Sequence, residues 1–282
     1  MRLIQSVADM KARCREISRT GKTLGFVPTM GALHDGHASL VRASKGQCEA
    51  TAVSIFVNPL QFGPDEDLAK YPRTLERDGE MLEALGADLL FVPTMEEMYP
   101  AGATTHVEVG GLSERLDGLS RPGHFRGVAT VVAKLFEIVR PDRAFFGQKD
   151  AAQVAVLRRM VRDLDMDVEL VVCPIVREAD GLAMSSRNAY LNENERKQAL
   201  VLQRALLRVL HDTDQGERDI GKLMATGEGV IAEEPAARLD YFAIVDPDSL
   251  EPVSDLSRGA LVAVAVFIGT TRLIDNLLLG PR

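Results

Sequence analysis

The sequence predicts an α/β protein with two domains: a larger one built on a parallel sheet and, after it, a smaller α+β domain with an antiparallel sheet. Over the first two-thirds of the chain, short apolar runs rich in branched residues alternate with amphipathic stretches, which is the pattern of βαβ units. Beyond Arg187, two helical stretches precede three strand-like runs that have no crossover helices between them. A chain of 282 residues, 46% of them hydrophobic, can bury a substantial core.

The first domain is expected to contain strands at 23–27, 50–57, 88–92, 143–146 and 168–172, each a short apolar run. Between them, apolar residues recur at three- and four-residue intervals, which predicts helices at 38–44, 73–85, 127–139 and 151–164. Strand and helix in repeated alternation predict a Rossmann-like sheet. Ligands of such sheets bind beyond the carboxyl ends of the strands, so a site is expected in the segments that follow the strands.

The second domain is expected to contain helices at 193–210 and 220–233, then strands at 239–245, 261–267 and 272–279. The pattern changes within a polar stretch near residues 176–190. This divides the chain into a Rossmann-like domain over residues 1–176 and an α+β domain over residues 177–282.

Composition restricts the partners and the cellular location. The formal net charge is -8 and no basic tract is present, so a nucleic-acid partner is not expected. Cys14, Cys48 and Cys173 lie far apart without a CxxC pair, which favours a reduced cytoplasmic protein over a disulfide framework or a thiolate metal site. No apolar stretch reaches the roughly 18 to 20 residues of a membrane span, and the N-terminus lacks the apolar block of a signal peptide.

The first candidate motif is PTMGALHDGH at 28–37, which follows the first predicted strand and runs into a helix expected to begin near Ala38. Gly31 and Gly36 allow the backbone to approach a ligand closely, and the amides of the next helix favour a phosphate. His34 and His37 are three residues apart, so their rings can face one spot. Two capping or surface histidines are the structural alternative. Zinc is weaker, because further ligands and an HExxH pattern are absent, and no metal site is expected.

Asn58 and Gln61 follow the second predicted strand and offer uncharged donors and acceptors to a hydroxyl or a carboxylate. The alternative is a strand that ends in an Asn-Pro turn. The acidic residues at 65–67 are interpreted as a solvated loop.

A third candidate segment, FGQKD at 146–150, follows another predicted strand. Lys149 can reach a triphosphate, although an isolated lysine is more often on the surface. Asp150 can cap the next helix or bind ribose or magnesium. Gln153, four residues after Lys149, can face the same cleft.

In the fourth segment, VREADGLAMSSRN at 176–188, two hydroxyls and a guanidinium occupy consecutive positions, Ser185, Ser186 and Arg187. Such a group suits a departing pyrophosphate. The alternative is a serine-rich loop that caps the next helix. A nucleophilic serine is not expected, because a GxSxG elbow is missing. His124 precedes a helix and is interpreted as part of a structural turn, with a substrate-facing position as the alternative; His106 and His211 are interpreted as surface or core residues.

Together with HFRGVATVV at 124–132, these motifs resemble the pantothenate synthetase family of the nucleotidyltransferases that carry a HIGH-type motif. The resemblance extends from the opening helix to the C-terminal strands. It implies that a pantoate carboxylate attacks the α-phosphorus of ATP to give pantoyl adenylate and pyrophosphate, and that β-alanine then displaces AMP to give pantothenate. It also implies Mg²⁺ bound mainly through the ATP phosphates, a homodimer formed mainly by the N-terminal domain, and a C-terminal domain that acts as a lid.

The resemblance assigns His37 as the catalytic histidine, and we expect His34 and Lys149 to act with it. It places pantoate, and with it β-alanine, at Gln61 and Gln153. ATP is placed at a larger set: Met30, Gly31, Ala32, Leu33, His34, Asp35, Gly36, His37, Gly147, Gln148, Lys149, Asp150, Val176, Met184, Ser185, Ser186 and Arg187. The chain departs from the family pattern at Asp35, where glutamate is frequent, and at Ala151 and Ala152, which affects local packing more than activity.

Three alternatives remain at this point. Another small-molecule nucleotidyltransferase would share the HxxH turn and the Ser-Ser-Arg loop, but the amides of Gln61 and Gln153 favour a hydroxy-acid pocket. A regulatory module without catalysis would bind ATP without turnover. A tRNA-linked synthetase is disfavoured by the acidic balance of the chain.

Overall fold

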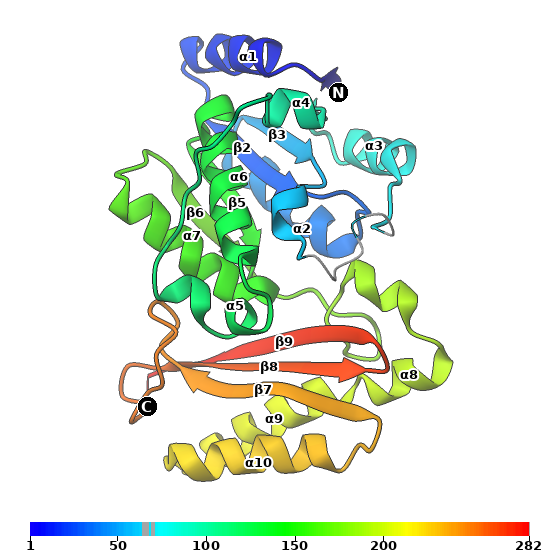
Figure 1. Ribbon diagram of the computed structural model, residues 1–282, viewed down its shortest axis with the longest axis vertical. Coiled ribbons are helices and arrows are strands. Elements are labelled where there is room, and N and C mark those ends of the chain that lie inside the picture. Colours follow the sequence, from blue (N-terminus) through cyan, green and yellow to red (C-terminus); the bar gives the residue numbers. More distant parts are fainter. Residues whose placement is uncertain (64–67, 69–70, 282) are drawn as a thin grey trace.

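The molecule contains two sheets, one in each half along its long axis (Figure 1). The computed structural model describes residues 1–63, 68 and 71–281, so the expected acidic loop at 65–67 lies outside the described residues. None of the described helices is long and apolar enough to cross a membrane. The α/β fold class predicted from the sequence is confirmed.

Within the described chain, the N-terminal sheet has six strands, all parallel to their neighbours. In spatial order they are β1 (Arg2–Ile4), β4 (Leu89–Phe91), β3 (Ala50–Ile55), β2 (Leu24–Thr29), β5 (Arg143–Gly147) and β6 (Glu169–Cys173). The chain passes outward from β2 through β3 to β4, then crosses back to β5 on the other side of β2. This reversal is the switch point at which doubly wound sheets bind their ligands.

Helices cover both faces of this sheet because neighbouring residues of a strand point to opposite sides. Phe26 and Ala144 join a core with α1 (Val7–Arg19), α6 (His124–Val139) and α7 (Ala151–Asp163). Val27 and Phe145 join a second core with α2 (Asp35–Gln47) and α3 (Leu75–Ala84). The shorter helices are η1 (Pro59–Gln61), α4 (Met95–Met98), η3 (Leu112–Glu114), α5 (Asp117–Ser120), η4 (Gln148–Asp150) and η5 (Ser186–Tyr190).

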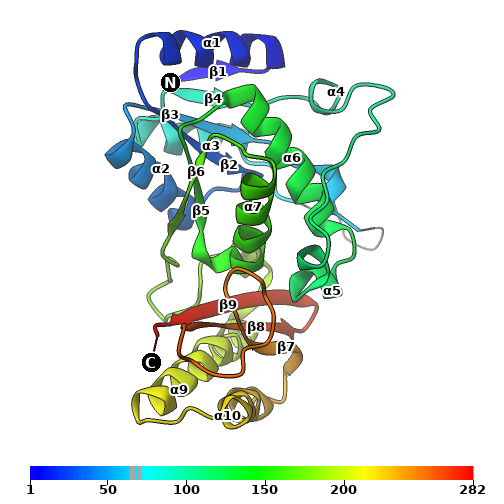
Figure 2. The ribbon, with the colours of Figure 1, turned by 90° about the vertical axis from the view of Figure 1, so that its left-hand side faces the viewer.

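The C-terminal sheet is antiparallel, in the order β7 (Ala237–Val245), β8 (Ala260–Ile268) and β9 (Thr271–Leu279). One face packs on α9 (Val201–Asp214) and α10 (Ile220–Ala232), through residues such as Phe242 and Val264. Leu261 and Ala263 join the core of the parallel-sheet domain instead. The small sheet therefore lies between its own helices and the larger domain, as Figure 2 shows. The boundary at 176/177 falls in the connection after β6 and stays a prediction.

Three expectations about individual elements are corrected. Strand β1 was missed, because three residues at the sheet edge are too few to show a periodicity. Helix α2 begins at Asp35, not near Ala38, since His34 caps it. The helix expected at 193–210 is divided into α8 (Glu193–Gln198) and α9, because the hydrogen bonds shorten to three-residue steps, from Leu200 N–H to the Lys197 carbonyl and from Leu202 N–H to the Ala199 carbonyl.

Candidate active site

A cavity of about 240 Å³ lies at the switch point, beyond the carboxyl ends of β2 and β5. Its walls come from the first turn of α2, from η1, α6 and η4, and from the segments at 174–176 and 184–187. All four sequence motifs contribute to it. The predicted site residues that line it are Met30, His34, Gly36, His37, Gln61, Gly147, Lys149, Asp150, Gln153, Val176, Met184, Ser185, Ser186 and Arg187.

The two histidines of the first motif are held by the start of α2. The Nδ1 atom of His34 accepts the N–H of Gly36 at 3.1 Å, and the Nδ1 atom of His37 accepts the N–H of His34 at 3.3 Å. A backbone N–H can only donate, so each Nδ1 is unprotonated and each ring carries its proton on Nε2. The ring centroids lie 4.2 Å apart. The alternative of two capping histidines is therefore correct for Nδ1 of each ring, but both rings also line the cavity.

Both imidazoles are neutral at physiological pH. Burial, and then the neighbouring His34, lower the pKa of His37 to about 3. Burial also lowers the pKa of His34, and the charge of Lys149 adds to this effect. Each ring is therefore a neutral donor through Nε2–H. The zinc alternative finds no support, since within the described ranges no three His, Cys, Asp or Glu side chains are grouped as metal ligands.

The turn that leads into His34 is held by a buried carboxylate. Gly31 (φ 85°) and Ala32 (φ 52°) both adopt left-handed backbone conformations. Asp78 of α3, only 1% exposed, accepts the N–H groups of Ala32 at 2.8 Å and Leu33 at 2.9 Å. The hydroxyl of Thr74 donates to it as well, at 3.0 Å. Sequence reasoning missed Asp78, although a carboxylate four residues before the buried Leu82 on an amphipathic helix was a usable signal.

Lys149 and Asp150 extend from η4 beside the histidines. The Lys149 side chain is only 17% exposed, and its Nζ lies 3.4 Å from Asp150 Oδ1, so the surface-lysine alternative is wrong. Asp150 stands at the N-cap of α7 but makes no side-chain capping bond. Burial alone would raise the pKa of Asp150, but Lys149 and then Arg187 outweigh it and hold the pKa below its ordinary value. The carboxylate stays ionised and free to accept from a ligand.

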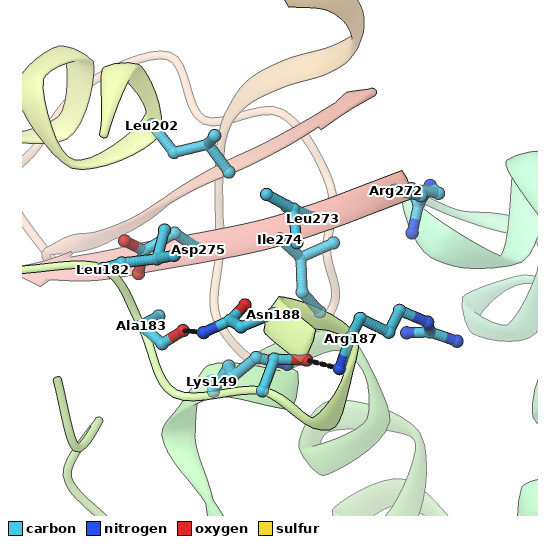
Figure 3. A pocket seen from close by; sticks show the side chains of 11 residues that line it. Lys149, Leu182, Ala183, Arg187, Asn188, Leu202, Arg272, Leu273, Ile274 and Asp275 are labelled. Atoms are coloured by element: carbon cyan, nitrogen blue, oxygen red, sulfur yellow. Dashed lines mark hydrogen bonds between the residues drawn. The ribbon is translucent and has the colours of Figure 1, made fainter. Parts of the chain in front are cut away.

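The Ser185–Arg187 segment closes the cavity from the side of the C-terminal domain. The Ser185 hydroxyl accepts the N–H of Arg187 at 3.2 Å, which fixes the start of η5. Asn188 donates to Glu178 Oε1 at 2.6 Å and to the Ala183 carbonyl at 3.1 Å. These bonds within the loop fix its backbone, and the hydroxyls of Ser185 and Ser186 line the cavity. In the view of Figure 3, Lys149 and Arg187 lie below the β9 residues Leu273 and Ile274.

Gln61 is 7% exposed and lies in η1. Arg121 donates to Nε2 of His124 at 2.9 Å, so the proton of this ring is on Nδ1. Nδ1 in turn donates to the Gln61 carbonyl at 2.9 Å. His124 therefore has the expected structural role and also lines the cavity. Asn58, in contrast, is 1% exposed and bonds the Gly127 carbonyl and the Tyr99 hydroxyl, so its amide serves the fold rather than a ligand.

Five residues predicted for ATP do not line this cavity, and their assignment stays a prediction. Gly31 and Ala32 form the turn, Leu33 is core, and Asp35 is exposed. Gln148 bonds Asn276 of β9. His106 and His211 are both exposed.

Conversely, much of the apolar wall was missed. It consists of side chains that sequence reasoning treated only as parts of strands, turns and a helix: Phe56, Phe62, Val128, Val131, Val132 and Leu135. The signal was present in α6, which is apolar around most of its circumference. Tyr71 and Arg121 also line the cavity without having been predicted.

Comparison with known proteins gives consistent matches over the whole chain. The family model described as pantoate-beta-alanine ligase matches residues 2–278. Pantothenate synthetase from Koribacter versatilis is 61% identical, over 100% of this chain and 99% of its own. The enzyme from Acidobacterium capsulatum is 62% identical, over 99% and 97%.

Solved structures agree with these matches. The pantothenate synthetase structure from Thermus thermophilus superposes with a TM-score of 0.95 at 50% identity and covers both chains completely. The pantoate-beta-alanine ligase from Francisella tularensis, described as complexed with β-γ ATP and β-alanine, gives a TM-score of 0.81 at 32% identity, over 99% of this chain and 97% of its own.

Proposed function

The chain belongs to the pantoate–β-alanine ligase family and joins pantoate to β-alanine; we propose that it does so with ATP, through a pantoyl adenylate formed in the cavity between β2 and β5. The observation that supports this best is the convergence of two neutral imidazoles, an ammonium, a guanidinium and two side-chain amides on one cavity. These groups come from four separate segments of the chain. A relative whose structure is described with ATP and β-alanine supports the same substrates.

In the first step a carboxylate oxygen of pantoate attacks the α-phosphorus of ATP. The bond from that phosphorus to the bridging oxygen breaks, and pyrophosphate leaves. In the second step the amine of β-alanine attacks the acyl carbon, the bond to the AMP oxygen breaks, and the amine loses a proton. Neither step requires a protein nucleophile, so positioning and charge stabilisation supply the catalysis.

The positions of the donors suggest how the work is divided. Lys149, Ser185, Ser186 and Arg187 would bind the β- and γ-phosphates, where the charge of the leaving pyrophosphate develops. The Nε2–H groups of His34 and His37 would donate to the α-phosphate oxygens in the transition state. Because Nδ1 of each ring is bound to the backbone, these donors are oriented before ATP arrives.

The carboxylate of Asp150 fits a magnesium ion that is held mainly by the triphosphate, since Mg²⁺ commonly takes one or two carboxylates beside phosphate oxygens. When bound, Mg²⁺ would neutralise part of the phosphate charge. Gln61 and Gln153 would bind the hydroxyl and carboxylate groups of pantoate without adding charge. The apolar surface of α6 suits the methyl groups of the same substrate.

The family match over residues 2–278 favours the ligase over the alternative of another small-molecule nucleotidyltransferase. An assay separates the two. The purified protein is mixed with ATP, Mg²⁺, pantoate and β-alanine, and AMP and the amide product are measured. Sustained AMP release that requires both organic substrates is expected for the ligase. Nucleotide transfer that is indifferent to β-alanine would refute this proposal.

We also propose a homodimer formed mainly by the N-terminal domain, as the family resemblance implies. Light scattering coupled to size-exclusion chromatography tests it directly, and a monomer at assay concentrations would contradict it. A cytoplasmic location stays the expectation from the three separated cysteines.

A further inference from the structure

Two neighbouring residues of β9 hold the two segments that carry Lys149 and Arg187. Asn276 of β9 is 3% exposed and bonds η4, the segment of Lys149. Its amide donates to the Gln148 carbonyl at 3.0 Å and to the Lys149 carbonyl at 2.9 Å. Its Oδ1 accepts from Gln148 Nε2 at 3.0 Å. Both amide hydrogens and the side-chain oxygen of Asn276 are therefore used to hold one turn.

Asp275 holds the other segment. Its side chain, 2% exposed, accepts two bonds from Arg177, from Nη1 at 2.7 Å and from Nη2 at 3.0 Å. Arg177 Nη1 also donates to the Gly181 carbonyl at 3.1 Å, and Arg177 pairs with Ala183 in a short antiparallel bridge. Arg177 thus fixes the base of the loop that presents Ser185–Arg187. The N–H of Asn276 donates to Asp275 Oδ1 at 2.8 Å, which joins the two anchors.

We propose that Asp275 and Asn276 are positioning residues, which set the distance between the Lys149 ammonium and the Ser185–Arg187 loop across the triphosphate site. Neither side chain lines the ATP cavity itself. Asp275 borders a separate small space of about 10 Å³, together with Asn188 and Lys149 (Figure 3). This inference rests on the proposed function, in which Lys149 and Arg187 share one triphosphate.

The positions of Lys149 and Arg187 explain why their spacing needs to be fixed by residues of β9. Lys149 and Arg187 belong to segments that are separate along the chain, and their like charges repel each other, although Asp150 beside Lys149 offsets part of this repulsion. Buried, fully bonded anchors resist that repulsion more firmly than exposed pairs, because their partners cannot exchange with water. The C-terminal domain therefore does more than cover the site, since it fixes the spacing of the two cationic groups.

The test uses pantoate-dependent ATP–pyrophosphate exchange with the whole protein. Asn276→Ala removes the three bonds to η4, while Asn276→Asp keeps the shape but points oxygen at two carbonyls. We expect both to lower kcat/KM for ATP by about 10- to 100-fold, as a displacement of catalytic groups by about 1 Å does. The KM for pantoate at saturating ATP should not change. Asp275→Asn should show the same pattern.

Asp240→Asn is the matched control. Asp240 of β7 also joins the two domains, through a bond of 2.7 Å from the Ser120 hydroxyl, and its other partner, Arg272 at 2.7 Å, lies in its own domain. No bond links Asp240 to η4 or to the Ser185–Arg187 loop. This variant should lose thermal stability and keep its KM for ATP. If Asn276→Ala behaves like the control, or if its KM for pantoate rises together with its KM for ATP, the role of Asn276 is structural only and the inference fails.

A double-mutant cycle shows whether the effect passes through Lys149. In a Lys149→Ala background, Asn276→Ala should have no further effect on the exchange rate. An equal loss in both backgrounds would overturn the inference. If Asn276→Ala does not fold, Asp275→Asn applies the same test, because it removes the charge that pairs with Arg177. A wild-type kcat/KM for ATP in that variant would also overturn the inference. A wild-type protein that forms no pantothenate would refute the proposed function instead.

Discussion

A methyl group added at Gly127 should displace η1, and with it Gln61 of the proposed pantoate pocket. Gly127 lies in α6 and packs directly against η1, which carries Gln61. A Cβ at this position would lie 2.0 Å from the Leu60 carbonyl oxygen and 2.8 Å from the Gln61 nitrogen. Ordinary contact requires about 3.5 Å, so η1 and α6 must separate by roughly 1.5 Å. Both clashing atoms are backbone, and a side-chain rotation cannot relieve the clash.

Two consequences follow for Gly127→Ala. Overpacking of this kind costs about 1–3 kcal/mol in the free energy of unfolding. The shift also moves Gln61 and strains the bond of 3.0 Å from Asn58 to the Gly127 carbonyl. Since a displacement of about 1 Å can reduce catalysis by about 10²-fold, we expect kcat/KM for pantoate to fall by that order. The KM for ATP should change much less, because the phosphate-binding groups lie on other elements.

Steady-state kinetics with pantoate and ATP varied separately, together with urea unfolding, measure both effects. Gly229→Ala in α10 is the control, because a Cβ there meets nothing within 4 Å. That variant should be stabilised by about 0.5–1 kcal/mol and keep full activity. The reasoning is refuted if Gly127→Ala keeps a wild-type KM for pantoate, or if both KM values rise equally.

Three further predictions concern the turn and its histidines. His37→Ala should remain folded but lose pantoate-dependent ATP–pyrophosphate exchange by about 10²–10³-fold, the usual effect of removing one transition-state donor, and near-normal exchange would contradict the role of His37. The folded pKa of His37, about 3, lies below its ordinary value of 6.5. The unfolded chain therefore binds a proton that the folded protein does not, and the free energy of unfolding should fall as pH drops from 6.5 toward about 3. Urea titrations over this range should show a weaker pH dependence in His37→Ala, and an identical slope would contradict the burial argument. Asp78→Ala should cost about 1–3 kcal/mol for each of the two N–H groups left unbonded, and should lower kcat because His34 loses its support; a variant with wild-type stability and kcat would rule out that support.

The sequence predicted the elements whose periodicity is strong and the residues that stand directly after strands. His34, His37 and Lys149 could be found in this way, because the carboxyl ends of parallel strands meet at one edge of the sheet. For Asp78 the sequence signals only a carboxylate on the buried side of an amphipathic helix; its role could not be predicted, since it depends on the left-handed turn at Ala32, and a positive φ at alanine has no sequence signal. Asn276 was missed for a related reason: its partners are backbone carbonyls on the other domain, and pattern analysis identifies side-chain types rather than long-range partners.

The arrangement also explains why the histidines and the cations stand on different elements. Two protonated imidazoles 4.2 Å apart would repel each other, and the backbone bonds to both Nδ1 atoms exclude that state. The α-phosphate would thus meet neutral donors, while the positive charge is concentrated at Lys149 and Arg187, where pyrophosphate would leave. Pairing of β2 with β5, from Gly25–Arg143 to Phe26–Ala144, brings the two sets together although more than a hundred residues separate them. A donor set that is neutral at the site of attack and charged at the leaving group favours the departure of pyrophosphate over that of AMP, which is the direction that adenylate formation requires.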